Sequence, residues 1–214
     1  TYDAVDRLVD ATTRAAHEIF SYDPVGSLTG RLEGGDPPWS LAPGNVLLQA
    51  GKRRFLYDGK RRRIQEKQGD KATVYGWDSL DRLREIVLAD GTRVRFTYDA
   101  LGRRVRKDVL GPADAAAIIL EGQTVERRSV AFLWDGLTLA EERNPRSPTN
   151  DGVQRVHVHA PGTWVPLLQI DRGAPYAVVT DPLGAPRELV DVDGRVAWRA
   201  TPRAWGDVTQ ASRD

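Results

Sequence analysis

The chain has 214 residues, of which 40% are hydrophobic and 29% are charged, and its formal net charge is +1. This balance is typical of a folded protein and excludes a chain that is disordered throughout. The absence of cysteine excludes a disulfide scaffold and a thiol nucleophile, and the near-neutral charge gives no sign of nucleic acid or an acidic membrane as a partner.

A short unit recurs along the first half of the chain: an aromatic residue, an aspartate, two further residues and then a residue that favours turns. The copies begin at Tyr2-Asp3, Tyr22-Asp23, Tyr57-Asp58, Trp77-Asp78 and Tyr98-Asp99. Their starts are separated by 20, 35, 20 and 21 residues. A short, fixed period indicates one supersecondary unit stacked on its neighbours.

The residues before each copy alternate as in a strand that is buried on one face. Val94, Phe96 and Tyr98 share one face, and Phe55 with Tyr57 repeats the pattern. The aspartate that follows can accept hydrogen bonds from the backbone N–H groups of a turn. Each unit is therefore predicted to be an antiparallel β-hairpin.

The fourth residue after each aromatic is expected to adopt a left-handed backbone conformation. Glycine at positions 26 and 102 and aspartate at positions 6 and 81 tolerate that conformation better than most residues. Arg61 occupies the same place in the third copy and does not belong to this group. The sequence therefore predicts that the third turn is altered.

Further hairpins are predicted where Asp90-Gly91 and Asp193-Gly194 lie between strand-like segments, because Asp-Gly favours tight turns. Longer connections are expected at residues 34–44, 111–122 and 144–152, with a helical turn or two at residues 113–120. No segment resembles a signal peptide, and the longest apolar run, residues 115–120, is too short to span a membrane. The chain contains no methionine, which predicts a processed product or a piece of a longer protein.

From residue 132 the repeat changes, but the pattern of strands and turns continues. Trp134-Asp135-Gly136 resembles a shortened copy, and Asp181-Pro182-Leu183-Gly184 forms another turn. We expect residues 1–130 to form the regular repeats and residues 131–214 to continue the same sheet, with a soft boundary between them.

Repeats of the form Tyr-Asp-x-x-Gly-Arg at this period resemble the YD repeats of the Rhs family. Residues 134–141 and 180–206 also resemble, in order, segments near the end of the family's core. The resemblance implies an all-β fold in which antiparallel hairpin repeats form a curved sheet, part of a hollow β-shell related to the toxin-complex proteins. In the family the shell encloses a C-terminal toxin until delivery, by type VI secretion or another export route.

The resemblance implies the partners and the location of the chain. The partners would be the remaining shell segments, or a second copy paired through open sheet edges, together with the toxin cargo and the secretion machinery. The chain would be held in the cytoplasm and then exported, secreted or displayed on the cell surface. Neither nucleic acid nor a membrane span is expected.

The repeated aromatic and turn residues are predicted to have a structural role, without cofactor, metal or catalytic function. They are Tyr2, Asp3, Tyr22, Asp23, Gly26, Tyr57, Asp58, Trp77, Asp78, Tyr98, Asp99, Gly102, Trp134, Asp135, Gly136, Asp181, Gly184, Trp198, Trp205 and Gly206. Asp181-Pro182-Leu183-Gly184 is similar to the start of the family's aspartyl autoprotease motif. Because Ala185-Pro186-Arg187 follows in place of the expected glycines, no protease role is assigned to Asp181.

Particular residues of the sequence suggest four other functions. The basic clusters at residues 52–54 and 60–63, with aromatic residues between them, could bind nucleic acid, although Glu66 and Asp70 lie nearby in sequence. His157 and His159 share a strand face, as in many metal sites. Ser129 or Ser147 would need a histidine and an acid for hydrolysis. The main alternative is a cell-surface carbohydrate-binding or adhesion module that uses the aromatic rings.

Overall fold

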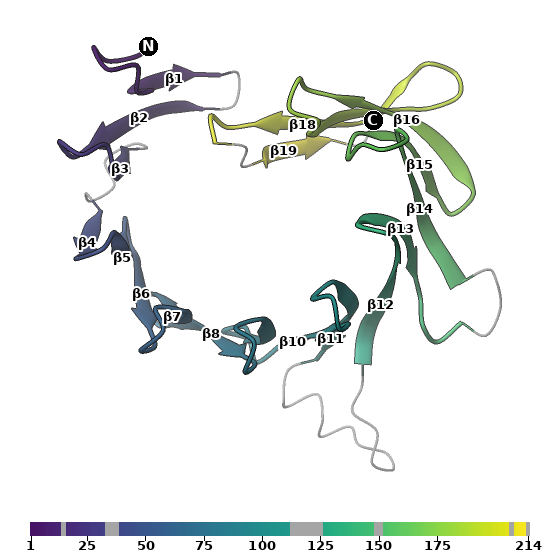
Figure 1. The fold of residues 1–214 in the computed structure, drawn as a ribbon, viewed down its shortest axis with the longest axis horizontal. Coiled ribbons are helices and arrows are strands. Elements are labelled where there is room, and N and C mark those ends of the chain that lie inside the picture. The colour runs from purple at the N-terminus through teal and green to yellow at the C-terminus, as the bar shows by residue number, and fades with distance from the viewer. Residues whose placement is uncertain (14–15, 33–38, 112–125, 148–151, 206–207, 213–214) are drawn as a thin grey trace. The chain divides into compact units, whose positions relative to one another are not determined.

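The computed structural model describes residues 1–13, 16–32, 39–111, 126–147, 152–205 and 208–212, and within these ranges the regular elements are all β-strands (Figure 1). The strands are β1 (Asp10–Thr12), β2 (His17–Tyr22), β3 (Leu28–Leu32), β4 (Ser40–Ala42), β5 (Val46–Ala50), β6 (Arg53–Tyr57), β7 (Arg63–Gln68), β8 (Lys71–Trp77), β9 (Leu83–Val87), β10 (Arg93–Tyr98), β11 (Arg104–Leu110), β12 (Glu126–Asp135), β13 (Thr138–Arg143), β14 (Val153–His159), β15 (Pro166–Asp171), β16 (Ala174–Thr180), β17 (Pro186–Val190), β18 (Val196–Pro202) and β19 (Val208–Ser212). The prediction of an all-β chain of antiparallel hairpins is confirmed. None of the described residues belongs to a helix long and apolar enough to cross a membrane.

Strand order follows chain order. Strands β1 to β3 form a three-stranded sheet, and β4 to β19 follow one another in a sixteen-stranded sheet. In the sixteen-stranded sheet, the turns that end β4, β6, β8, β10, β12, β14, β16 and β18 lie on one edge, which we call the repeat edge. The other turns of this sheet lie on the opposite edge.

The chain divides into two compact units, which are described separately below. Unit 1 comprises residues 1–95 and 110–125, and unit 2 comprises residues 96–109 and 126–214. The soft boundary at residue 130, expected from the change in repeat type, stays a prediction.

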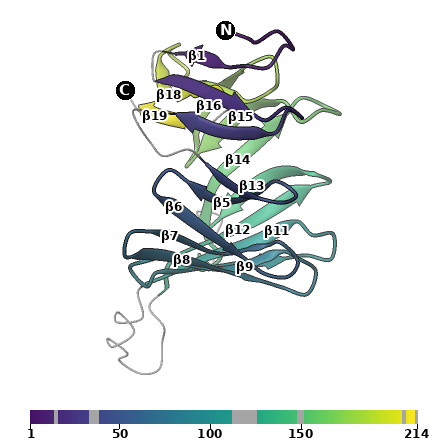
Figure 2. The same ribbon diagram turned by 90° about the vertical axis from the view of Figure 1, so that its left-hand side faces the viewer.

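The best-buried aromatic residues lie two positions before the aromatic residue of a repeat. Phe20, Phe55 and Phe96 expose only 3%, 4% and 8% of their surface. Arginine side chains cover two of these rings: the guanidinium of Arg63 lies 4.2 Å from the ring centroid of Phe55, and that of Arg104 lies 4.0 Å from Phe96. The alternation predicted for β6 and β10 is thus confirmed, and Figure 2 shows β6, β7 and β8 of unit 1 side by side.

The Asp-Gly hairpins are present, but their turns are longer than the two-residue type. Between β9 and β10, Leu88 N–H donates to the Thr92 carbonyl (2.8 Å) and Gly91 N–H donates to the Leu88 carbonyl (2.9 Å). Gly91 has a φ of 79°. This pattern belongs to a three-residue loop with a left-handed bulge residue, which also matches the twist of paired strands.

Several predicted features lie outside the described residues. They are the helical turn at residues 113–120, Gly206, and parts of the connections at residues 34–44, 111–122 and 144–152.

Candidate functional site

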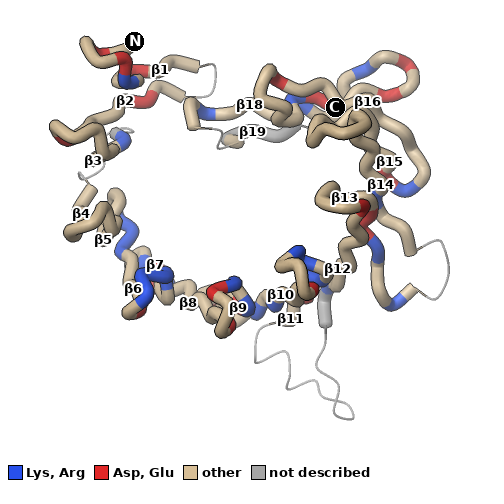
Figure 3. Tube along the Cα trace, viewed as in Figure 1, with Lys and Arg blue, Asp and Glu red and all other residues tan. Residues whose placement is uncertain are grey.

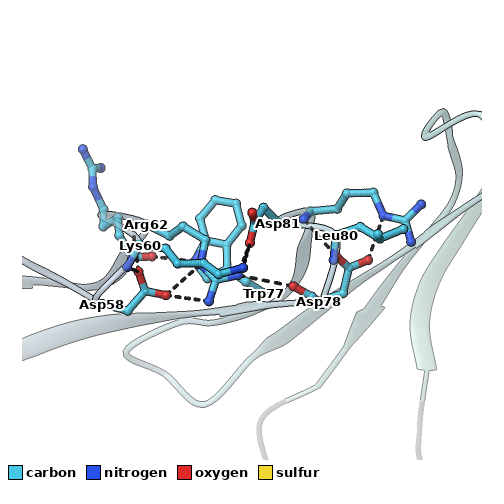
Figure 4. A network of polar contacts seen from close by, with 9 residues as sticks. Asp58, Lys60, Arg62, Trp77, Asp78, Leu80 and Asp81 are labelled. Atoms are coloured by element: carbon cyan, nitrogen blue, oxygen red, sulfur yellow. Dashed lines mark hydrogen bonds and ion pairs between the residues drawn. The ribbon is translucent and has the colours of Figure 1, made fainter.

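Each repeat turn is organised by its aspartate. In the turn between β8 and β9, Asp78 Oδ1 accepts hydrogen bonds from the backbone N–H groups of Leu80 and Arg82, both at 2.9 Å. Asp78 Oδ2 accepts from Arg82 Nε at 2.7 Å (Figure 4). The backbone closes the same three-residue loop as above, with Asp81 at a φ of 61°. The carboxylate thus accepts hydrogen bonds from turn N–H groups that have no partner in the strand pairing of the hairpin.

The same contacts recur in three other turns. Asp3, Asp58 and Asp99 each accept from the N–H groups two and four residues later, and from an arginine Nε at 2.7 Å. Asp23 keeps the two backbone bonds, but Ser27 stands where the other turns have arginine. The aspartate and the arginine are therefore separable parts of one design.

The prediction of an altered third turn is wrong. Arg61 adopts a φ of 61°, and its N–H donates to the Asp58 carbonyl at 2.9 Å, as the equivalent residues do in the other turns. The four other hydrogen bonds of this turn are retained around Asp58, and they hold Arg61 in the left-handed region despite the cost to a side chain with a Cβ.

Consecutive turns are joined by a reciprocal contact, which we call the inter-turn clamp. Its two parts are the arginine four residues after one repeat aspartate and the aromatic residue of the next repeat. Arg62 Nη1 donates to the Asp78 carbonyl (3.3 Å), while Trp77 Nε1 donates to the Arg63 carbonyl (2.8 Å). The Arg62 guanidinium also lies 5.9 Å from the Trp77 ring centroid (Figure 4).

The clamp recurs elsewhere in both units. Tyr22 Oη donates to the Leu8 carbonyl (2.8 Å) and Arg7 Nη1 to the Asp23 carbonyl (3.0 Å). In unit 2, Trp134 Nε1 donates to the Arg104 carbonyl at 2.9 Å, and Arg103 Nη1 donates to the Gly136 carbonyl at 2.5 Å. The repeat aromatic is thus more than an apolar filler, because its polar atom satisfies a main-chain carbonyl of the preceding hairpin.

The turn contacts lower the pKa of the aspartates. For Asp78 the main cause is the backbone hydrogen bond from Arg82, and for Asp58 it is the hydrogen bond from the Arg62 guanidinium. Arg62 in turn has a raised pKa, because Asp58 and then Asp81 stabilise its charge. These carboxylates are tuned to remain ionised, which suits hydrogen-bond acceptors in a scaffold rather than proton donors.

The Asp99 turn of unit 2 keeps the whole design, but the later turns at Asp135 and Asp181 keep only parts of it. Asp181 accepts from the N–H groups of Leu183 and Ala185 at 2.9 Å, but its arginine, Arg187, has moved to six residues later. The backbone bonds to Ala185 and Leu183 are the main causes of the lowered pKa of Asp181. The aspartate of the Asp-Pro-x-Gly sequence therefore sits in a repeat-type turn, with Thr180 in place of the aromatic.

The turn after β12 has the repeat aromatic but lacks the aspartate cap, the reverse of the Asp181 turn. Trp134 retains its bond to the preceding hairpin, but the loop shrinks to Gly136 and Leu137, with Gly136 at a φ of 56°. Here the carbonyl of Asp135 accepts from Thr138 Oγ1 (2.9 Å), and Asp135 itself is exposed. The change in repeat type expected at this point corresponds to the loss of the aspartate cap.

The remaining predicted residues differ in how deeply they are buried. Tyr2 and Trp205 expose 68% and 57% of their surface, so neither is packed like the other repeat aromatics. Trp198 is half-buried and lines, with Tyr176 and Leu189, a hollow of about 520 Å³ on unit 2. Gly26, Gly102 and Gly184 occupy the left-handed positions of their turns; their φ values lie between 80° and 89°.

Sequence reasoning missed two parts of the site. The arginines of the clamp were visible as a residue recurring four places after the aspartate. A turn at residues 43–45, between β4 and β5, lacks both the aromatic and the aspartate, and it divides the 35-residue gap between Tyr22 and Tyr57. Its left-handed residues are Gly44 and Asn45, and Tyr57 Oη donates to the Leu47 carbonyl just beyond it (2.7 Å).

The basic and histidine clusters are largely paired with acids. Glu66 lies within 3.5 Å of both Arg53 and Arg63, as the sequence suggested, although the trace of β6 and β7 is mainly basic (Figure 3). His157 Nε2 contacts Glu142 Oε1 at 3.1 Å, and this contact is the main cause of the lowered pKa of Glu142. Among the described residues there is no group of three or more potential metal ligands.

Comparison with known protein families identifies two segments of the chain. The family model described as RHS Repeat matches residues 77–113, and the model described as RHS protein matches residues 178–212. Both segments of the chain are therefore Rhs-family sequence. The two matches cover the repeat turns of Asp78 and Asp99 and the C-terminal hairpins that carry Asp181.

Similar Rhs-family proteins include several bacterial toxins. The chain is 28% identical to double-stranded DNA deaminase toxin A of Burkholderia cenocepacia, over 99% of the chain and 17% of that protein. It is 27% identical to toxin protein Tse5 of Pseudomonas aeruginosa, over 89% and 16%, and 30% identical to probable deoxyribonuclease RhsA of Dickeya dadantii, over 75% and 11%. The chain thus spans less than a fifth of these relatives.

Solved structures also contain a similar arrangement. A crystal structure of TcdB2-TccC3-TEV aligns with 99% of the chain and 12% of its own, at a TM-score of 0.41 and 15% identity. A Photorhabdus luminescens Tc holotoxin pore aligns with 100% of the chain and 12% of its own, also at a TM-score of 0.41.

Proposed function

We propose that this Rhs chain is a wall segment of a shell that confines a toxin in a bacterial polymorphic toxin system. The toxin would follow the shell in the same polypeptide and stay inactive until it is delivered by type VI secretion or another export route. The chain itself would act as a scaffold, without catalysis, and its repeat aromatics, aspartates and glycines would hold the wall together.

The inter-turn clamp carries this proposal. A wall must resist opening between hairpins, and backbone pairing alone gives each strand only its two neighbours. The clamp adds two hydrogen bonds and a stacked guanidinium at the turn end of each junction where it occurs. The recurring polar contacts of the chain thus join hairpins to one another rather than forming a reactive cleft.

The relatives support the association with toxins. Three differently described proteins, two of them named as toxins, contain a segment that is 27–30% identical to this chain, and that segment is only 11–17% of each of them. A segment shared among a named deaminase toxin, Tse5 and a probable deoxyribonuclease is better suited to a common carrier than to any one reaction.

The sheet edges suggest how the wall continues. Strands β1 and β3 are the outer strands of the small sheet, and β4 and β19 are the outer strands of the larger one. Outer strands present unpaired backbone groups that favour pairing with another strand. We infer that neighbouring shell segments, or a second copy, pair with these strands.

Protease protection of the intact polypeptide that carries this chain tests the proposal. The region after the chain should resist digestion in the wild type and become cleavable when the clamp is removed by Trp77→Ala and Trp134→Ala together. Leu80→Ser and Leu137→Ser, at exposed positions beside the same turns, form the matched control and should leave protection unchanged. Equal digestion of all three proteins would overturn the proposal.

The carbohydrate-binding alternative retains one supporting observation, the exposure of Trp164 (66%) and Trp205 (57%). Rings this open could stack on a sugar, unlike the half-buried Trp77 and Trp134. A saturable change in tryptophan fluorescence on adding glycans, lost in Trp164→Ala, would favour this second function.

A further inference from the structure

A row of exposed apolar side chains follows the repeat edge of unit 2. The row is formed by Leu101 (73% exposed), Leu137 (63%), Trp164 (66%), Leu183 (94%) and Trp205 (57%). Each residue lies in a different turn, after β10, β12, β14, β16 and β18 respectively. Large exposed apolar residues are ordinary when scattered, but one on each of five successive turns forms a continuous stripe.

Four of the five turns that carry this row are uncharged at their tips. Residues 100–102, 136–137, 160–165 and 182–185 contain no charged residue, whereas Arg203 lies in the turn of Trp205. On the opposite edge of unit 2, the described turns carry exposed charges at Arg146, Arg172 and Asp193. The repeat edge of unit 1 is also charged, with Lys60 and Asp81 ion-paired across two turns. Exposed apolar tips also occur in unit 1, at Leu80 (69%) and Val25 (86%), but the turns after β4 and β6 carry none. Among the described turns, the unbroken row is therefore limited to unit 2.

The stripe also contains a recess. A hollow of about 480 Å³ is lined by Leu137, Ala140, Pro161, Trp164 and neighbouring residues, between the turns after β12 and β14. Alternate turns on one edge repeat at two strand spacings, or about 10 Å. The row thus presents projecting side chains at a regular interval with a recess between two of them.

We propose that the repeat edge of unit 2 is a self-association surface, occupied by the same edge of a second copy of this chain. A surface with a fixed spacing is best matched by another with the same spacing. A two-fold axis would place each projecting side chain of one copy between two of the other, in a closed, self-complementary contact. This proposal does not depend on the shell function, and it differs from strand pairing because it uses side chains at turn tips.

The available area suits such a contact. Three leucines and two tryptophans that are mostly exposed would bury roughly 600 Å² per copy, or about 1,200 Å² in total. Stable protein interfaces begin at about 1,200 Å². At the turns of Leu101, Leu137, Trp164 and Leu183, no charged tip residue is desolvated when the two edges meet.

The oligomeric state of the full 214-residue chain tests the proposal by sedimentation velocity over a range of concentrations. The wild type is expected to dimerise. The tip variant Leu101→Ser, Leu137→Ser, Leu183→Ser should weaken dimerisation by ~100-fold or more, because it removes the apolar contacts and leaves the turn N–H groups in place. Circular dichroism and the Tm check that each variant is folded.

A matched control separates this edge from general surface hydrophobicity. Leu167→Ser, Val179→Ser, Val192→Ser replaces three apolar residues of unit 2 that are 49%, 44% and 80% exposed and lie off the repeat edge. This variant should dimerise like the wild type. The proposal is overturned by a strictly monomeric wild type, including one that binds zwitterionic vesicles as a monomer. It is also overturned if both triple variants associate equally well, as pairing through open strands would predict.

Discussion

Two groups of turns join the strands of the same sheet through different side-chain contacts. The first group contains the turns at Asp58, Asp78 and Asp99, and the second contains those at Asp135 and Asp181. The first group combines a repeat aromatic, an aspartate cap and an arginine four residues later. The turn at Asp181 keeps the cap without the aromatic, and the turn at Asp135 keeps the aromatic without the cap. The common feature is the hairpin itself, so the three side chains act as separable supports.

This difference has a consequence for stability. Where all three supports are present, the loss of one leaves the turn held by the others. Where only one is present, it carries the junction alone. The following predictions test how far the two groups of turns differ, beginning with the largest expected effect.

Phe96→Ala should destabilise the protein by about 3–5 kcal/mol, because the ring is 8% exposed and covered by Arg104. The equivalent position before Asp181 is Val178, which is half-buried, and Val178→Ala should cost only about 1 kcal/mol. Urea unfolding followed by circular dichroism measures both. Similar losses in the two variants would contradict the comparison.

Trp77→Phe and Trp134→Phe should each cost about 1–3 kcal/mol, since each removes a hydrogen bond to a carbonyl and part of a ring. The loss should be larger for Trp134→Phe, because its turn has no aspartate cap to hold the junction. Equal losses in the same unfolding assay would show that the cap does not compensate for the missing bond.

Substitutions at the left-handed position should change the stability in opposite directions in two turns. Gly102→Ala should cost about 1 kcal/mol, although the added Cβ would meet no atom within 4 Å, because the φ of 80° disfavours alanine. Arg61→Gly should stabilise its turn by up to ~1 kcal/mol, because glycine relieves the left-handed strain. Thermal unfolding gives both shifts, and a destabilised Arg61→Gly would mean that the side chain has a stabilising contact.

The smallest effect is a pH dependence. The pKa of Asp78 is lowered in the folded state, so its carboxylate stabilises the fold above the ordinary aspartate pKa of 3.8, and this stability is lost as the pH falls through the folded pKa. Asp78→Asn should therefore be less stable than the wild type at pH 7, and the difference should disappear in acid. Asp135→Asn, at an exposed position, serves as the control and should follow the wild type across the range.

Much of the fold was predictable from the sequence, because its signals are local. Alternation before Tyr98 identified the buried face, and the aspartate after it identified the turn. The clamp was not predictable from single residues, because the partner of Trp77 is a main-chain carbonyl fourteen residues earlier. Any residue type can supply a backbone carbonyl, so the acceptor cannot be recognised from the sequence. The prediction at Arg61 was wrong for a related reason: the hydrogen bonds of the neighbouring residues outweigh the preference of arginine against a left-handed backbone.

The chain-order pairing of the strands also determines how the protein would respond to force. Within each sheet every strand pairs with its neighbours in sequence, so tension on a terminus meets one hairpin at a time and no strand is threaded behind another. Pulling should therefore peel the sheet in steps about two strands long. A wall that holds against lateral stress could still be drawn out as a linear thread through a narrow passage.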